Sequence, residues 1–203
     1  MATIDSPFAF LIEMFASERL KTLTVWSEFD DTDLRFRPAA VARTVHEQMV
    51  HQCLSEDGWF TKMLGLPTPL SPLPEREDRL SFLEHYAEVS GRRLDALRHQ
   101  PANWFEGEAE FFGAPRTRSW VLVRRIAHTA HHRGQLTIYL RLLGRSLYST
   151  YGPTADTGGL PANGATVVYR YGSIEDLLAG ERNRTEARRL PGPGARPVTE
   201  RGA

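Results

Sequence analysis

The chain has 203 residues, enough for one domain of ordinary size with a full hydrophobic core. Its 25 basic and 25 acidic side chains balance, so no net charge draws it toward nucleic acid or an anionic membrane. The one cysteine, Cys53, excludes an internal disulfide and fits a reducing compartment. The first ten residues do not resemble a signal peptide, and no apolar run could span a bilayer, so we expect a cytoplasmic protein.

Three long helices are predicted in the first half of the chain. The first covers residues 6–29, because Ser-Pro at its start suits an N-cap and a first helical position. The second covers residues 44–64, where Thr44 and Glu47 form the T-x-x-E pattern of a capping box. A proline-rich crossing separates it from the third helix, residues 75–99.

A fourth and longer helix is predicted for residues 119–144, with Ser119 as the N-cap and Gly144 as the stop. Its apolar residues are too frequent for an exposed helix, so it should be largely buried. Residues 100–117, which precede it, are expected to be irregular and to cover one end of the helices or line a pocket. Their four large aromatic residues should all be buried: Trp104, Phe105, Phe111 and Phe112.

The composition changes after the fourth helix to a Gly- and Pro-rich stretch. Residues 167–171 could form one short strand, and Ser173 should cap a short helix. The polar tail, residues 182–203, is expected to be disordered or draped over the surface. The predicted fold class is therefore all-α: a four-helix bundle over residues 1–150, with an irregular extension, residues 151–203, packing on it.

Three histidines lie in the middle of the fourth predicted helix. His128 and His132 are four residues apart, so one helical face carries both rings. Two imidazoles one turn apart grip a metal ion in the H-E-x-x-H motif, but the intervening Glu of that protease motif is missing here. Gln135 continues the same face, whereas His131 and Arg133 should point elsewhere. Structural roles for the histidines are the alternative, and a metal site requires a third ligand from another helix.

The second predicted helix offers two further histidines. His51, in mid-helix, is the better third ligand, and His46, in the first turn, is the alternative. Glu47 precedes His51 by four residues, so its carboxylate could orient that ring, or the two could form a simple surface pair. Three imidazoles without a fourth protein ligand make an open, catalytic type of site. The isolated His85 and His99 are expected to be non-ligands.

Two stretches resemble the DinB-like, or DinB/YfiT, superfamily of metalloenzymes. The first is HTAHHRGQL at residues 128–136, followed by LLG at 142–144, and the H-x-x-x-H-R-G-Q block within it is the more specific match. The second is TVHEQMVHQCLSEDGWF at residues 44–60, which is similar to the first-ligand helix of that family. The resemblance covers about residues 5–155.

This resemblance implies a four-helix bundle with a long second-to-third connection. It also implies a divalent metal ion, commonly zinc or nickel, held by His51, His128 and His132, and a homodimer. Some members of the superfamily transfer or isomerise groups with low-molecular-weight thiols such as bacillithiol, mycothiol or glutathione, and others have been proposed as metal-dependent hydrolases. The stretch beyond residue 151 departs from the common bundle.

Three functions remain open, each with a small molecule or a metal ion as partner rather than nucleic acid or membrane. The leading hypothesis is a thiol-dependent S-transferase, in which Cys53 is a core residue and not the nucleophile. The second is a hydrolase with metal-activated water, for which Glu47 and Glu56 are general-base candidates only if they face inward. The third is a non-catalytic metal-binding stress protein. Arg133 should pair with an acidic residue and Gln135 should hydrogen-bond inside the bundle, with substrate contacts as the alternative role for each; no catalytic residue is assigned.

Overall fold

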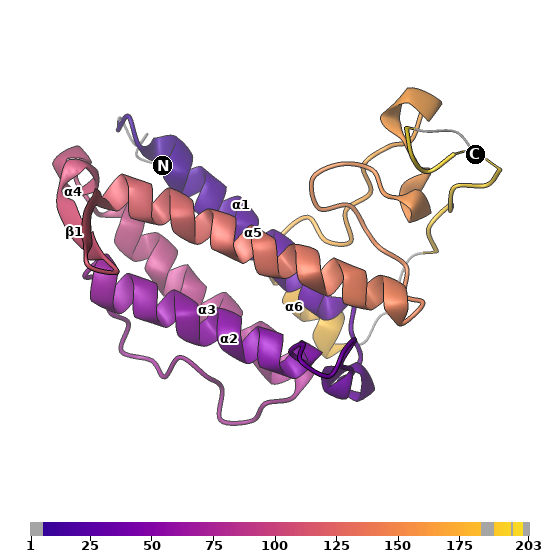
Figure 1. The fold of residues 1–203 in the computed structure, drawn as a ribbon, viewed down its shortest axis with the longest axis horizontal. Helices are drawn as coiled ribbons and strands as arrows, with labels where there is room; N and C mark the ends of the chain where they lie inside the picture. Colours follow the sequence, from indigo (N-terminus) through magenta and orange to yellow (C-terminus); the bar gives the residue numbers. More distant parts are fainter. Residues whose placement is uncertain (1–5, 184–188, 196, 201–203) are drawn as a thin grey trace.

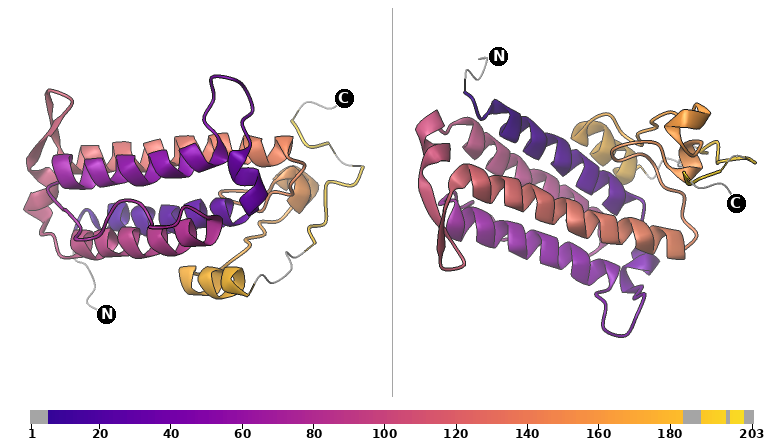
Figure 2. Two further views of the ribbon diagram at one scale, coloured as in Figure 1. Left: turned by 90° about the horizontal axis from the view of Figure 1, so that it is seen from below. Right: turned by 45° about the horizontal axis from the view of Figure 1, so that its top comes forward.

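The computed structural model describes residues 6–183, 189–195 and 197–200, and it is mostly helical, as expected. Four long helices lie side by side (Figures 1 and 2): α1 (Ala9–Ser27), α2 (Val45–Gly58), α3 (Arg79–Arg98) and α5 (Arg118–Leu142). One end carries α4 (Ala102–Glu106) and the strands β1 (Glu108–Phe111) and β2 (Ala114–Thr117). The remaining elements are short: η1 (Asp31–Arg35), η2 (Trp59–Met63), η3 (Ala155–Thr157), η4 (Pro161–Asn163) and α6 (Ile174–Arg182).

Three of the long helices, α2, α3 and α5, start at a capping side chain. The predicted capping box of Thr44 and Glu47 is present, and α2 continues past Gly58 as the π-helical turn η2. The third helix begins later than predicted, because the Asp78 side chain accepts the amide hydrogen of Ser81. Thr117, rather than Ser119, caps α5. The first helix begins at Ala9, two residues after the predicted Pro7.

An antiparallel hairpin departs from the all-α prediction. Strands β1 and β2 pair with Phe111 opposite Ala114, so Phe112 and Gly113 form a two-residue turn. Both turn residues have positive φ, 49° and 81°. A bulky residue in that conformation costs about 1–2 kcal/mol, which is why Asn-Gly is the common choice. The burial prediction is correct for Phe105, which is fully buried, but wrong for Phe112, which is 76% exposed.

The C-terminal extension packs through α6, which contacts α1 and α3. Ser173 caps α6 as predicted, its hydroxyl accepting the amide hydrogen of Asp176. Within the described part of the chain, residues 167–171 form no strand: Val168 bonds to Ser149 through both its carbonyl and its amide, and no ladder continues from that pair. Part of the tail predicted to be disordered or draped, at residues 184–188, 196 and 201–203, lies outside the described residues. No helix in the described ranges is both long and apolar enough to cross a membrane.

The core between the long helices has two apolar clusters. One contains Leu23, Met49, Cys53, Phe82 and Leu136. The other contains Phe15, Phe60, Leu97, Val121 and Leu122. On every long helix, buried polar residues lie between the two apolar sets or at the edge of one of them: Glu18, Arg19, Gln52, Glu56, Ser90, Arg93, Arg125, Thr129, His132 and Arg133. This polar layer crosses the middle of the helices, and the predicted metal-binding histidines lie at the same level.

Candidate metal centre

Three histidines from two helices meet at the middle of the α2–α5 interface. The Nε2 atom of His132 lies 3.0 Å from Nε2 of His51 and 3.2 Å from Nε2 of His128. One nitrogen of each ring lies within 4.8 Å of the others. His128 and His132 share a face of α5 because they are one helical turn apart, and α2 packs against that face. The structure therefore brings together the three residues that the sequence singled out.

The nitrogen spacing fits a shared cation. Metal–imidazole bonds of about 2.0–2.1 Å at tetrahedral angles would put the ligand atoms about 3.3–3.4 Å apart. The two short Nε2 separations, 3.0 and 3.2 Å, are close to that distance between two ligand atoms. Three neutral nitrogen donors suit zinc, nickel and related divalent ions. The spacing and chemistry of the three nitrogens thus fit a divalent metal ion, with one coordination position left for water or substrate.

Two glutamines orient the ring of His132. Its Nδ1 atom lies 3.0 Å from the side-chain oxygen of Gln48 and 3.0 Å from that of Gln135. The Gln48 amide also donates to the Gln135 oxygen at 2.9 Å. Because both neighbours of Nδ1 are acceptors, the His132 proton belongs on Nδ1 and the Nε2 lone pair faces the cluster. Gln135 was expected to hydrogen-bond within the helices and does so, whereas Gln48 was not anticipated.

A buried arginine holds His128. Arg125 is fully buried, and its Nη1 atom donates to Nδ1 of His128 at 3.2 Å and to the Ser55 hydroxyl at 2.9 Å. The ring of Trp59 lies beside that of His128, with centroids 5.6 Å apart. With Nδ1 accepting from Arg125, the proton of neutral His128 lies on Nε2, directed at His132. A cation at this position would displace that proton.

The three imidazoles are neutral at pH 7. Burial, helped by the nearby charge of Arg125, lowers the pKa of His128 to about 3. Burial also lowers the pKa of His132 to about 4, against the opposing effect of the hydrogen bond that His132 donates to Gln135. The pKa of His51 is lowered too, mainly by burial. Metal ions bind the neutral form of imidazole, so no imidazolium has to be deprotonated, and the Nε2 proton of His128 is the one that a cation would displace.

Glu47 and Glu56, which were considered for orienting a histidine ring or acting as a general base, lie away from the three-histidine cluster. Glu56 is fully buried, accepts hydrogen bonds from Tyr86 at 2.7 Å and Arg93 at 3.1 Å, and lies 3.7 Å from Arg125. Its carboxylate therefore balances the charges of the polar layer. The exposed Glu47 carboxylate accepts from the backbone of its own capping box and from Arg37, so it does not orient His51.

The other predicted residues have structural partners. His46, the alternative ligand, pairs with Glu77 at 2.6 Å and is not in the three-histidine cluster. The predicted non-ligands His85 and His99 each bond to a backbone carbonyl. Arg133 pairs with Glu18 of α1, as the ion-pair interpretation expected. Burial raises the pKa of the Cys53 thiol, which agrees with its assignment as a core residue.

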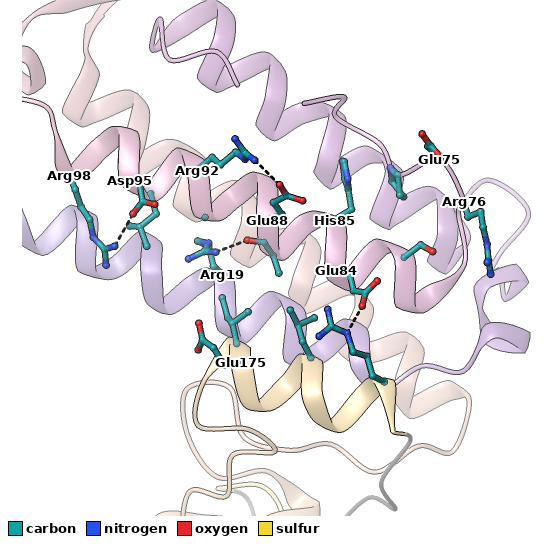
Figure 3. A pocket seen from close by; sticks show the side chains of 18 residues that line it. Arg19, Glu75, Arg76, Glu84, His85, Glu88, Arg92, Asp95, Arg98 and Glu175 are labelled. Atoms are coloured by element: carbon teal, nitrogen blue, oxygen red, sulfur yellow. Dashed lines mark hydrogen bonds and ion pairs between the residues drawn. The ribbon is translucent and has the colours of Figure 1, made fainter. Parts of the chain in front are cut away.

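A groove of about 910 Å³ lies elsewhere, along α3 between α1 and α6 (Figure 3). None of the three clustered histidines lines it. Its charged side chains largely neutralise one another, as in the pairs Arg92–Glu88, Arg98–Asp95 and Arg182–Glu84. The groove thus adds no residue to the histidine centre.

Comparisons with known proteins agree with the helical fold. A DinB-like protein from Bacillus cereus has a solved structure that is 22% identical, with a TM-score of 0.62, covering 70% of this chain and 95% of its own. Another DinB-like protein, from Bacillus subtilis, is 16% identical, with a TM-score of 0.55 and coverages of 68% and 94%. At these identities the likeness concerns the fold alone. No curated protein matches the chain. The family model of the DinB family matches residues 5–159, and the chain therefore belongs to the DinB family.

Proposed function

We propose that this protein binds one divalent metal ion through His51, His128 and His132 and uses it in a thiol-dependent transfer reaction on a small molecule. The observation that carries the proposal is the convergence of three neutral imidazole nitrogens, with Nε2 separations of 3.0 and 3.2 Å. Zinc and nickel are among the ions that this donor set suits.

The surrounding side chains support a site built for a cation. Gln48 and Gln135 hold His132 with its Nε2 lone pair toward the other two rings. When bound, a divalent ion supplies a Lewis acid that lowers the pKa of a coordinating thiol or water. The positive charge of Arg125 beside His128 adds to the preference for an anionic group at the open position.

The lack of a nearby carboxylate favours a thiol over water as the reacting group. Hydrolysis by an activated water benefits from a general base within hydrogen-bond reach. Glu47 and Glu56 are occupied by Arg37 and by Tyr86 and Arg93, and the metal-binding group among the described residues contains histidines alone. A thiol ionises more readily than water and needs no such base for its activation.

Metal analysis of purified variants tests the first part of the proposal. His51→Ala, His128→Ala and His132→Ala should each lose most of the bound zinc or nickel. His46→Ala removes a histidine of the same helix that lies outside the cluster, so it should retain the wild-type metal content. Equal metal content in all four variants would contradict the site.

Turnover assays on the metal-loaded protein test the second part. Bacillithiol, mycothiol and glutathione should each be offered with an electrophile such as chlorodinitrobenzene or maleylpyruvate. Consumption of one thiol that requires both metal and His132 would support transfer. Turnover of esters, amides or lactams without any thiol would replace transfer with hydrolysis, and inactivity in both panels would favour a metal-binding protein without catalysis.

A further inference from the structure

An aromatic cluster lies beside the histidine centre and leads from it to the surface. We define it as Trp59, Phe111, Phe112 and Trp120, which come from η2, the β1–β2 hairpin and α5. Trp59 contacts His128, with ring centroids 5.6 Å apart. Phe111 contacts both tryptophans of the cluster: its ring centroid lies 5.2 Å from that of Trp59 and 5.0 Å from that of Trp120. Aromatic contacts are therefore continuous from a metal-binding residue to the hairpin.

Phe112, at the outer end of this cluster, exposes an apolar ring at a turn position that a polar residue could fill. Phe112 is 76% exposed, and its ring centroid lies 6.4 Å from that of Trp59. It occupies the first position of the hairpin turn with a φ of 49°, a conformation that bulky side chains rarely adopt. A polar residue such as Asn would satisfy both the exposure and the backbone. Strained positions of this kind occur preferentially at ligand-binding sites.

From this continuity we infer that the aromatic cluster binds an aromatic group of the substrate while the reacting end of that substrate occupies the open position at the histidines. The inference rests on the proposed metal site and adds to it the chemical class of the substrate. Trp59, itself only 8% exposed, closes the end of the site next to His128, and the bound ring lies against the exposed ring of Phe112. Offset or edge-to-face contacts with these two rings supply the recognition. The Arg125 guanidinium, 5.8 Å from the Trp59 ring centroid, fixes that ring from behind.

Ligand binding to the cobalt-substituted protein tests the inference without relying on activity. Imidazole, 4-phenylimidazole and 4-(biphenyl-4-yl)imidazole present the same metal-binding nitrogen, with zero, one or two added rings. Each is titrated while the visible absorption of cobalt is followed. We expect at least one arylimidazole to bind about 3- to 10-fold more tightly than imidazole in the wild type, the range that one aromatic contact provides.

Two variants separate the aromatic contribution from other effects. Phe112→Asn removes the ring and places a residue suited to the turn, so the hairpin should keep its fold. It should bind imidazole as the wild type does but lose most of the gain from the aryl group. Phe10→Ala removes another exposed phenylalanine, 54% exposed on α1, and should keep the full gain.

The possible outcomes are distinct. Equal affinity for imidazole and both arylimidazoles in the wild type overturns the aromatic site and leaves the metal site intact. A gain that Phe112→Asn retains also overturns it. Absence of cobalt absorption in the wild type refutes the metal site itself, and the aromatic site with it.

Discussion

Replacing Gln48 with leucine should weaken metal binding even though Gln48 touches no metal. The Nδ1 atom of His132 has two acceptors at 3.0 Å, the side-chain oxygens of Gln48 and Gln135. A neutral hydrogen bond of this kind contributes about 0.5–1.5 kcal/mol. Gln48→Leu removes one of the two, so the dissociation constant for the metal should rise by about 2- to 12-fold.

The double variant should show a larger effect. Gln48→Leu with Gln135→Leu removes both acceptors, so neither the tautomer nor the orientation of the His132 ring is held. Loss of such support for a ligating histidine typically weakens metal binding by about 10- to 100-fold. The result should therefore exceed that of either single change.

Competition with a chromophoric chelator measures these constants. Gln52→Leu is the matched control, because Gln52 is fully buried one turn further along α2 and its amide donates only a long, 3.4 Å bond to the Gln48 carbonyl. That control should bind metal as the wild type does. Unchanged affinity in Gln48→Leu, or an equal loss in Gln52→Leu, would refute the role assigned to the Gln48 oxygen.

Three further predictions concern pH and the buried charges. Burial and Arg125 lower the pKa of His128 to about 3, and burial lowers that of His132 to about 4, so protons should not compete with metal for these two rings until well below pH 6. Metal release, monitored by cobalt absorption, should therefore begin below about pH 5. Release centred at pH 6.5 would contradict this. Burial raises the pKa of Glu28 from 4.5 to about 8, so between these pH values the folded state holds a proton that the unfolded state lacks. Stability should therefore fall as the pH rises through that window. The melting temperature should be lower at pH 9 than at pH 6, and Glu28→Gln should abolish this difference. Arg133 and Glu18 form a buried pair, and Glu18 also has Lys21 and Tyr151 as partners. Arg133→Met alone should therefore lower the free energy of unfolding by about 1–3 kcal/mol in denaturant titrations, the cost of removing one partner of a buried charged group. The double variant Glu18→Leu/Arg133→Met should recover most of this loss and keep its metal content.

The convergence of His51, His128 and His132 could be predicted because its signal is local. Two histidines four apart on one helix must share a face, and His51 was the mid-helix candidate on the other helix. Gln48 and Arg125 could not be identified in the same way. Their roles depend on how α2 and α5 are rotated against each other, and a buried glutamine or arginine has no spacing that distinguishes it from a surface residue.

The hairpin was missed because its turn lacks the usual sequence. Phe112-Gly113 replaces the Asn-Gly that marks a two-residue turn, and the strands have only four residues each. The opposite error occurred at residues 167–171, where Val and Tyr favour a strand but no neighbouring strand is available. Local preference for extended structure becomes a strand only when a partner supplies the ladder of hydrogen bonds.

The wide separation in the chain of the two helices that carry the clustered histidines has a consequence for folding if the proposed ion is bound. His51 and His132 are 81 positions apart, with all of α3 and the hairpin between them. An ion held by both helices acts as a removable cross-link that closes this long loop and restricts the unfolded chain. Chelation would then release a restraint on more than a third of the polypeptide, so metal supply would set the lifetime of the protein as well as its chemistry.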